Sequence, residues 1–127
     1  MKEYTFFKES QLFEMPEGWI VGFIEDMLDE LQAEVNRSNL NDYNVCQAKE
    51  KFGSLRWYDY CGNDETDKIV KKYENISEHT CCGCGKPATK ISLGWICPWC
   101  DECAKKISGD FRDIKRLLEL SVNFSYT

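Results

Sequence analysis

Two cysteine-rich runs determine the architecture of the second half of the chain: Thr80-Cys81-Cys82-Gly83-Cys84-Gly85 and Cys97-Pro98-Trp99-Cys100-Asp101-Glu102-Cys103. Each run holds a C-x-x-C pair, and 15 residues separate the two pairs. A C-x-x-C turn brings two thiolates onto one ion, and four thiolates satisfy the tetrahedral preference of Zn²⁺. The spacing is typical of a zinc ribbon, and Lys86–Trp95 between the pairs is long enough for two short strands joined by a turn. We predict one structural Zn²⁺ held by Cys81, Cys84, Cys100 and Cys103.

Other pairings of the cysteines stay open at this point, because six of the eight compete for four positions. Cys97 could replace Cys103, since Cys97-Pro98-Trp99-Cys100 is also a C-x-x-C pair, and Cys82 could replace Cys81. The same pair resembles the turn of a thiol redox protein, although such a turn needs a strand before it and a long helix after it. Disulfides or an iron–sulfur cluster are further alternatives. Four thiolate ligands would leave no coordination position for water or substrate, which indicates a structural role.

A long amphipathic helix is predicted ahead of this segment. It follows the break at Met15-Pro16-Glu17-Gly18 and begins near Trp19. Apolar residues then recur at steps of three and four, which places them on one helical stripe: Ile20, Phe23, Ile24, Met27, Leu28, Leu31 and Val35. Acidic residues fill the opposite face: Glu25, Asp26, Asp29, Glu30 and Glu34. The turn formers after Arg37 end the helix.

A β-hairpin is predicted next, with strands near 43–50 and 54–60 and a turn at Lys51-Phe52-Gly53. Gly53 suits the position that requires a positive φ. Leu55 and Trp57 alternate with Arg56, Tyr58 and Tyr60, so aromatic side chains fall on both faces of the hairpin. We predict a partner-binding set of hairpin aromatics: Phe52, Trp57, Tyr58 and Tyr60. Cys46 and Cys61 are expected to be small apolar residues in or beside this hairpin.

Two further helices complete the expected fold. One covers Glu65 to Ser77, is capped by Asp64 or Thr66 and turns Ile69, Val70, Tyr73 and Ile76 inward. The other begins near Gly109-Asp110 and contains Phe111, Ile114, Leu117, Leu118 and Val122. The fold class is therefore α+β: two helices on a small antiparallel sheet, continued by a zinc ribbon and a terminal helix. We expect a single domain, 1–127, with a helix-hairpin-helix body at 1–79 and the ribbon lobe and terminal helix at 80–127.

Composition favours a soluble globular protein, with 43% hydrophobic and 30% charged residues among 127. No apolar run approaches the roughly 20 residues that span a membrane, and the first residues lack the pattern of a signal peptide. The expected location is the cytoplasm.

Charge is distributed unevenly along the chain, and this distribution indicates what kind of partner the protein would bind. Residues 1–85 hold nine basic and 17 acidic residues, a net charge of −8, whereas residues 86–127 carry +2. An acidic body repels phosphates and attracts basic protein surfaces. We predict a non-enzymatic zinc-binding protein that engages a partner protein, a regulator or inhibitor acting through its acidic surface. Solvation alone could also explain the acidic face.

Nucleic-acid binding by the ribbon is the alternative function. Basic residues surround or follow the cysteines, with two tryptophans available for stacking: Lys86, Lys90, Lys105, Lys106, Arg112, Lys115 and Arg116, with Trp95 and Trp99. The only histidine, His79, precedes Cys81 by two residues and is either a neighbour of the metal or an exposed side chain. No phosphate-binding glycine loop and no nucleophile motif occurs in the sequence, so no enzymatic activity is predicted.

Two blocks of the chain resemble a family of small uncharacterised bacterial and phage proteins. One block is Gln47–Tyr58, containing Glu50-Lys51-Phe52-Gly53-Ser54-Leu55-Arg56-Trp57-Tyr58, similar to the family's EKFG-LR-Y hairpin. The other runs from Thr80-Cys81 through Gly94-Trp95 to Cys100-Asp101-Glu102-Cys103, similar to its TC-x-x-CG, GGW and C-D-x-C/H elements. The Gly18-Trp19 opening is similar too. The resemblance implies the pairing of Cys100 with Cys103 and a bacterial or phage origin, and it implies no activity.

Overall fold

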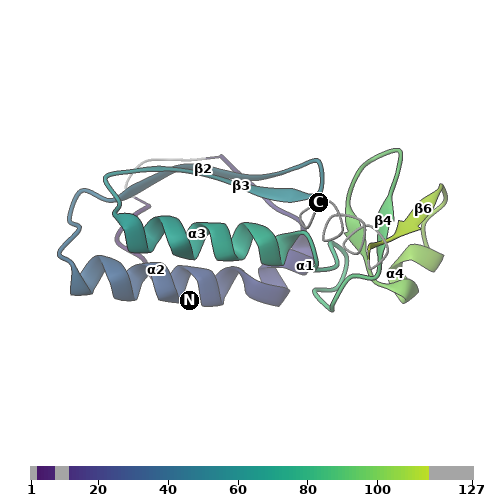
Figure 1. Ribbon diagram of the computed structural model, residues 1–127, viewed down its shortest axis with the longest axis horizontal. Coiled ribbons are helices and arrows are strands. Elements are labelled where there is room, and N and C mark those ends of the chain that lie inside the picture. Colours follow the sequence, from purple (N-terminus) through teal and green to yellow (C-terminus); the bar gives the residue numbers. More distant parts are fainter. Residues whose placement is uncertain (1–2, 8–11, 115–127) are drawn as a thin grey trace, which may run out of the picture.

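The computed structural model describes residues 3–7 and 12–114, which form an elongated body of two layers with a small lobe at one end (Figure 1). Two long helices, α2 (Glu25–Arg37) and α3 (Asp64–Ser77), lie side by side and run in opposite directions. A three-stranded sheet covers one face of this helix pair, and the cysteine lobe lies beyond the end of the sheet. The α+β class predicted from the sequence is confirmed.

The first helical segment contains a turn that the periodicity did not reveal. Helix α1 (Glu17–Trp19) leads into η1 (Ile20–Ile24), a stretch of π-helix, which continues directly into α2. Each π turn holds an extra residue, so the phase of the apolar stripe shifts at this point. Trp19 and Phe23 are buried, whereas Ile20 is exposed, so the prediction of a buried Ile20 is wrong.

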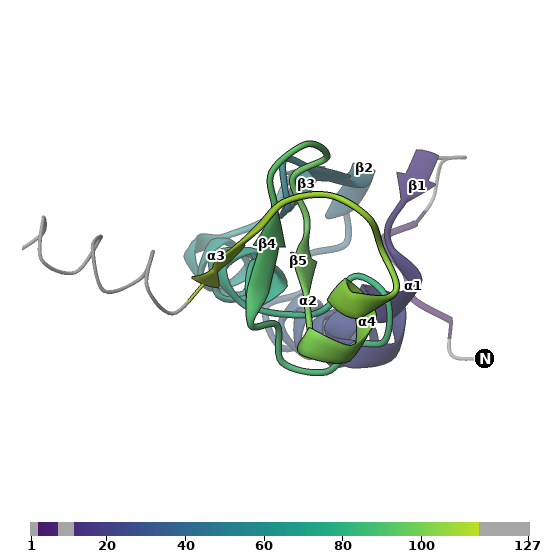
Figure 2. The ribbon, with the colours of Figure 1, turned by 90° about the vertical axis from the view of Figure 1, so that its right-hand side faces the viewer.

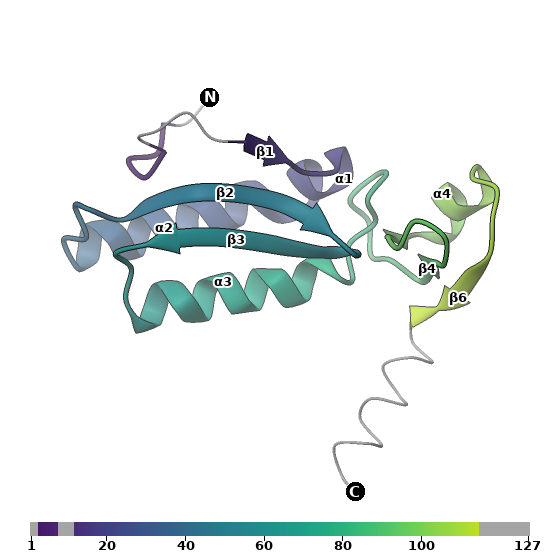
Figure 3. The ribbon, with the colours of Figure 1, turned by 90° about the horizontal axis from the view of Figure 1, so that it is seen from above.

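The main sheet is mixed, in the order β1-β2-β3. Strands β2 (Asn44–Lys51) and β3 (Ser54–Tyr60) form the predicted antiparallel hairpin, with a bulge at Cys46. Strand β1 (Leu12–Glu14) adds a parallel pairing with β2 that the sequence did not indicate (Figure 3). Leu55 and Trp57 are buried, whereas the alternate residues Arg56, Tyr58 and Tyr60 are exposed.

The apolar core lies between the sheet and the helices. Its fully buried members include Trp19, Met27, Leu31, Val45 and Leu55. Buried Cys82 and Cys97 of the lobe belong to the same cluster, so the core is continuous from the body into the lobe.

The lobe is built from very short elements around a second sheet, in the order β5-β4-β6 (Figure 2). Its elements are β4 (Lys90–Ser92), β5 (Pro98–Trp99), α4 (Asp101–Lys105) and β6 (Phe111–Asp113). The pairing strand of β4 therefore lies at Pro98–Trp99 and not before Trp95, as the sequence suggested. The predicted terminal helix is wrong at its start, because β6 occupies that position, and its remainder from 115 lies outside the described residues.

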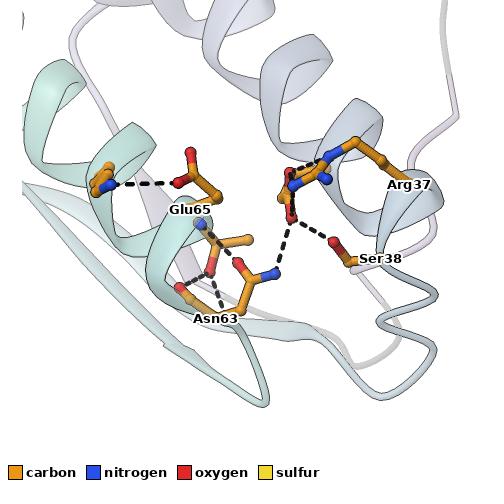
Figure 4. A network of polar contacts seen from close by, with 7 residues as sticks. Arg37, Ser38, Asn63 and Glu65 are labelled. Atoms are coloured by element: carbon orange, nitrogen blue, oxygen red, sulfur yellow. Dashed lines mark hydrogen bonds and ion pairs between the residues drawn. The ribbon is translucent and has the colours of Figure 1, made fainter.

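A buried carboxylate joins the end of α2 to the start of α3 (Figure 4). Glu34, predicted on the solvent face, is buried and accepts hydrogen bonds from Ser38 Oγ at 2.6 Å and from Asn63 Nδ2 at 2.8 Å. Arg37 forms an ion pair with it at 2.7 Å. Asn63, and neither Asp64 nor Thr66, is the N-cap of α3, in a reciprocal capping box with Thr66. Ile76, predicted inward, is exposed near the end of the same helix.

Acid is expected to weaken this junction. Hydrogen bonds from Ser38 and Asn63 and the charge of Arg37 lower the pKa of Glu34 from 4.5 to about 2. The stability that this carboxylate confers is fully present above the unfolded pKa and is lost as the pH falls through the folded value. When the pH falls from about 5 to about 2, the unfolding free energy of the wild type, measured with urea, should decrease. That of Glu34→Gln is expected to decrease by less, because the variant has no carboxylate to protonate at this position. The exposed Glu78→Gln variant should follow the wild type; equal curves for all three proteins would contradict this.

Candidate metal centre

Four cysteine sulfurs meet at one point of the lobe. The Sγ atoms of Cys81, Cys84, Cys100 and Cys103 all lie within 4.8 Å of one another, and Cys84 and Cys100 are 3.6 Å apart. Four sulfurs bound tetrahedrally with bonds of about 2.3 Å are held about 3.8 Å apart. All eight cysteines are free thiols in the structure, which does not adopt the disulfide alternative. These four residues are thus positioned to hold a metal ion, in the predicted register.

The first pair is shaped by a tight backbone turn. Cys81 N donates to Lys86 O at 2.8 Å, and Gly85 N donates to Cys81 O at 3.0 Å. Gly85 has φ +86°, which an L side chain rarely adopts. Gly83 N points at Cys81 Sγ from 3.3 Å. Backbone N–H groups directed at a sulfur favour its thiolate form, which is the form that binds metal.

The second pair opens helix α4. Cys100 is the N-cap of this helix, and its sulfur accepts from Cys103 N at 3.4 Å. The strand β5 that precedes it is anchored by Thr89 N, which donates to Trp99 O at 2.9 Å. One C-x-x-C therefore sits in a turn and the other at a strand-to-helix junction, and the short sheet holds the two against each other.

Cys81 and Cys103 differ in how readily they give up protons. Burial raises the pKa of Cys81, but hydrogen bonds from the backbone of Cys100, Cys84 and Gly83 outweigh it and bring the pKa to about 7. Burial and neighbouring thiols raise the pKa of Cys103 to about 12. Four thiolates this close repel one another, so a bound cation is what allows all four to be deprotonated together.

Cys82 and Cys97, the two competing cysteines, lie outside the four-sulfur group and face each other. Both are buried. A thiol–thiol hydrogen bond between them raises the pKa of Cys82 and lowers that of Cys97. Cys82 N also donates to Pro98 O at 3.0 Å, which ties the first cysteine turn to β5. These two thiols therefore pack the space between the metal centre and the body.

The metal centre is joined to the body through residues around α1. Gly18 N donates to Cys82 O at 2.9 Å, and the buried Trp19 Nε1 donates to Thr80 O at 3.1 Å. A Cβ atom on Gly18 would lie 2.0 Å from Cys81 O. The Gly18-Trp19 dipeptide, which marks only a helix start in the sequence, is in fact the contact of the first helix with the cysteine turn.

The remaining predicted residues are spread over several places. His79 is outside the sulfur group, and its Nδ1 lies 2.9 Å from Asn75 O. Trp99 is half-buried, and its Nε1 donates a hydrogen bond to Ser92 Oγ at 3.1 Å, which ties its ring to the lobe. Among the predicted partner-binding aromatics, Phe52, Tyr58 and Tyr60 are exposed. Trp57 is only 8% exposed and donates to Tyr43 OH at 3.2 Å, so its inclusion was wrong.

Comparisons of the chain with profiles of protein families, with curated proteins and with solved structures give no match. The resemblance to small bacterial and phage proteins therefore stays a prediction. Among the described residues, no helix is long and apolar enough to cross a bilayer.

Proposed function

We propose that the protein is a non-enzymatic zinc protein that engages a partner protein through an apolar patch at the junction of body and lobe. The observation that carries this proposal is the exposure of Phe52 and Trp95, at 67% and 77%, on two turns that lie together. We call Phe52, Trp95 and Ile96 the junction patch. Large apolar side chains left in water around a cavity are typical of protein-binding surfaces.

Zinc is the metal that the donor set favours. Four cysteine thiolates in a closed tetrahedral set are typical of structural zinc, and they leave no coordination position for substrate. The ion would hold the lobe together and so present the ribbon turn beside the hairpin turn. This is the basis for proposing a binding role and no catalytic one.

The shape of the junction patch suits a single side chain of a partner. The cavity between the two turns has a volume of about 230 Å³ and is lined by the patch together with Glu50, Lys51 and Gly94. Small-molecule pockets commonly range over about 300–1,000 Å³. A cavity below that range accepts one apolar side chain of a docked protein more readily than a metabolite.

Both turns are held in place. Gly53 N donates to Glu50 Oε2 at 2.8 Å, and a Cβ on Gly53 would lie 3.3 Å from Ile96 O. Ser92 Oγ accepts from Cys97 N at 3.0 Å and so closes the ribbon turn that carries Trp95. Little conformational entropy remains to be lost when a partner binds, which favours affinity.

Phe52 adopts a strained backbone conformation. Its φ is +54°, a left-handed value that is unusual for a bulky residue and suits Asn or Gly in a two-residue hairpin turn. The side chain is exposed as well, so its own packing does not explain its presence. A residue that is unfavourable for the fold and exposed at a cavity supports a binding role.

The acidic side of the body adds a preference for a basic partner. Carboxylates crowd the first turns of α2 and α3, among them Glu25, Asp26, Asp64 and Glu65. Such a surface speeds encounter with positively charged proteins and weakens with salt. We therefore propose regulation or inhibition of a basic bacterial or host protein in the cytoplasm.

Two substitutions in the junction patch test this function. Phe52→Asn is expected to raise the unfolding free energy by about 1 kcal/mol, because it relieves the left-handed strain, and to lose the partner. Trp95→Ser is expected to lose the same partner. The matched control is Val21→Ser, which changes a side chain that is also 77% exposed but does not line the cavity.

The measurement is affinity capture from a bacterial extract followed by mass spectrometry, with denaturant unfolding of each variant. The proposal is supported if one protein is retained by the wild type and by Val21→Ser and is released from both by salt. The same protein should not be retained by either patch variant. A partner retained equally by all four proteins would place the binding surface elsewhere.

A further inference from the structure

The outward face of the β2–β3 hairpin is left open by the described part of the chain. Helices α2 and α3 cover only the other face of the sheet, and Figures 1 and 3 show no described segment over the hairpin. Five side chains of this face are named here the open sheet face: Lys49, Lys51, Arg56, Tyr58 and Tyr60. Tyr58 and Tyr60 are 47% and 44% exposed.

Cations and tyrosine rings are interleaved on this face. Lys49 lies directly opposite Arg56 in the strand register, and Gln47 lies opposite Tyr58. Lys49 Nζ is 6.0 Å from the centre of the Tyr58 ring. Alternate residues of a strand are about 7 Å apart, so Arg56, Tyr58 and Tyr60 form a row along one strand. The result is a strip of positive charge beside π faces.

The cations of this strip form no ion pair among the described residues, although Glu14 of β1 lies beside Lys49 in the parallel register and Arg56 is near enough to Glu74 of α3 to oppose the rise in its pKa. Like charges directly opposite each other across two strands are destabilising. Among the described residues, the ion pairs lie along α2 and α3 and in the lobe, and none includes Lys49, Lys51 or Arg56. Cations that the fold neutralises only in part still attract an anion from outside.

Acidic residues are numerous on the helix side of the molecule, although Glu14 of β1 and Glu74 of α3 lie close to the open sheet face. The carboxylates of α2 and α3 lie on the helices, and the sheet lies between those helices and the open face. Charges separated by more than about 8 Å are largely screened at physiological salt. The net charge of −6 therefore does not describe the potential that a ligand meets at the open sheet face.

We propose that the open sheet face binds single-stranded nucleic acid, with phosphates on Lys49, Lys51 and Arg56 and bases stacked on Tyr58 and Tyr60. Exposed aromatic rings on a sheet, flanked by basic side chains, are the arrangement by which proteins hold unpaired strands. An acidic peptide would satisfy the cations but would leave the two rings without a stacking partner. This site meets the junction cavity only at Lys51, which lines both, and it does not require the partner protein.

The test is fluorescence anisotropy with a fluorescein-labelled oligo-uridine and the matching oligo-thymidine, using the intact metal-loaded chain. Three phosphate contacts predict roughly 20-fold weaker binding when salt rises from roughly 50 to roughly 200 mM. Tyr58→Ala should weaken binding about tenfold and leave the salt dependence unchanged, because it removes a stacked base. Lys49→Ala should reduce the salt slope by about 0.7.

Lys49→Glu separates binding from folding. It replaces repulsion from Arg56 by attraction and attraction to Glu14 by repulsion, so the stability of the fold should change little while the affinity falls. Lys105→Glu in the ribbon makes the same change in net charge on the exposed surface of α4 and is the control. Loss of binding with Lys49→Glu, and retention with Lys105→Glu, supports the proposal.

Three results would overturn it: no anisotropy change at low salt, equal weakening by Lys49→Glu and Lys105→Glu, or displacement of the oligonucleotide by polyglutamate as readily as by an unlabelled single strand. The second result would mean that the oligonucleotide binds to the ribbon or is attracted by net charge alone. The third would make an acidic peptide the ligand.

Discussion

Removal of the metal is expected to unfold the lobe from Cys81 onward while α2, α3 and the hairpin persist. The lobe has few apolar side chains of its own: among its buried residues are Cys81, Cys82, Cys97, Cys100, Ala104 and Ile114. Its strands have two or three residues each, too few to be stable alone. Structural zinc contributes on the order of 10–16 kcal/mol of binding free energy, which is comparable with the roughly 5–15 kcal/mol that stabilises a whole domain.

This expectation is measured in two ways. Elemental analysis of the purified protein should find one zinc per chain. After chelation, hydrogen exchange should rise across 81–106 by orders of magnitude more than across 25–37, because only the lobe depends on the ion. Readdition of zinc should restore protection.

A pair of serine substitutions identifies the ligands. Cys103→Ser removes one of the four sulfurs and should lower zinc affinity by several orders of magnitude, with loss of lobe protection. Cys61→Ser changes an exposed thiol outside the group and should bind zinc like the wild type. Full zinc binding by Cys103→Ser, or a protein without stoichiometric metal, would refute the assignment.

C-x-x-C spacing, a local property of the chain, predicted that two cysteine pairs hold one ion, but it fits Cys97–Cys100 as well as Cys100–Cys103, and the resemblance favoured the second pair. The two residues between each pair determine that both sulfurs reach one ion, whatever the rest of the fold does. The hairpin was predictable for a related reason, since Gly53 and the alternation of Leu55 and Trp57 are both local signals. That same alternation places Trp57 inward, and grouping it with the exposed aromatics disregarded this signal.

Features that depend on contacts distant in sequence were missed. The burial of Glu34 is decided by Asn63, 29 residues later, which supplies the hydrogen bond that makes a buried carboxylate tolerable. Exposure of Ile20 follows from a π turn whose effect is visible only when the helix packs. Strand β1 pairs parallel with β2 across a long connection, and no periodicity in three residues predicts such a pairing. The junction patch likewise unites Phe52 and Trp95, which are neighbours only because the lobe docks on the hairpin turn.

Gly18→Ala is expected to lower the unfolding free energy by about 3 kcal/mol or more, at a position where helix propensity alone would favour alanine by about 1 kcal/mol. The added Cβ would lie 2.0 Å from Cys81 O and 2.6 Å from the carbonyl carbon of Cys82. Both are backbone atoms, so no side chain can rotate away, and helix α1 must separate from the cysteine turn. That separation removes the Gly18 N to Cys82 O bond and uncovers Trp19.

Chemical denaturation of two alanine variants measures this effect. Gly94→Ala is the matched control, because its Cβ would meet no atom within 4 Å, and its stability should stay within about 0.5 kcal/mol of the wild type. Equal stability of Gly18→Ala and the wild type would show that α1 does not pack on the cysteine turn as described.

We expect zinc binding and the effect of Gly18→Ala to be coupled, and this coupling distinguishes a specific clash with the cysteine turn from a general loss of helix stability. If Gly18→Ala acts through the folded cysteine turn, it must also weaken zinc binding, since the ion stabilises the conformation that the new methyl group opposes. In the metal-free protein, where the turn is unfolded, the clash is absent and the alanine should be neutral or slightly stabilising for the remaining body. A destabilisation of the same size with and without zinc would mean that Gly18 serves the body alone.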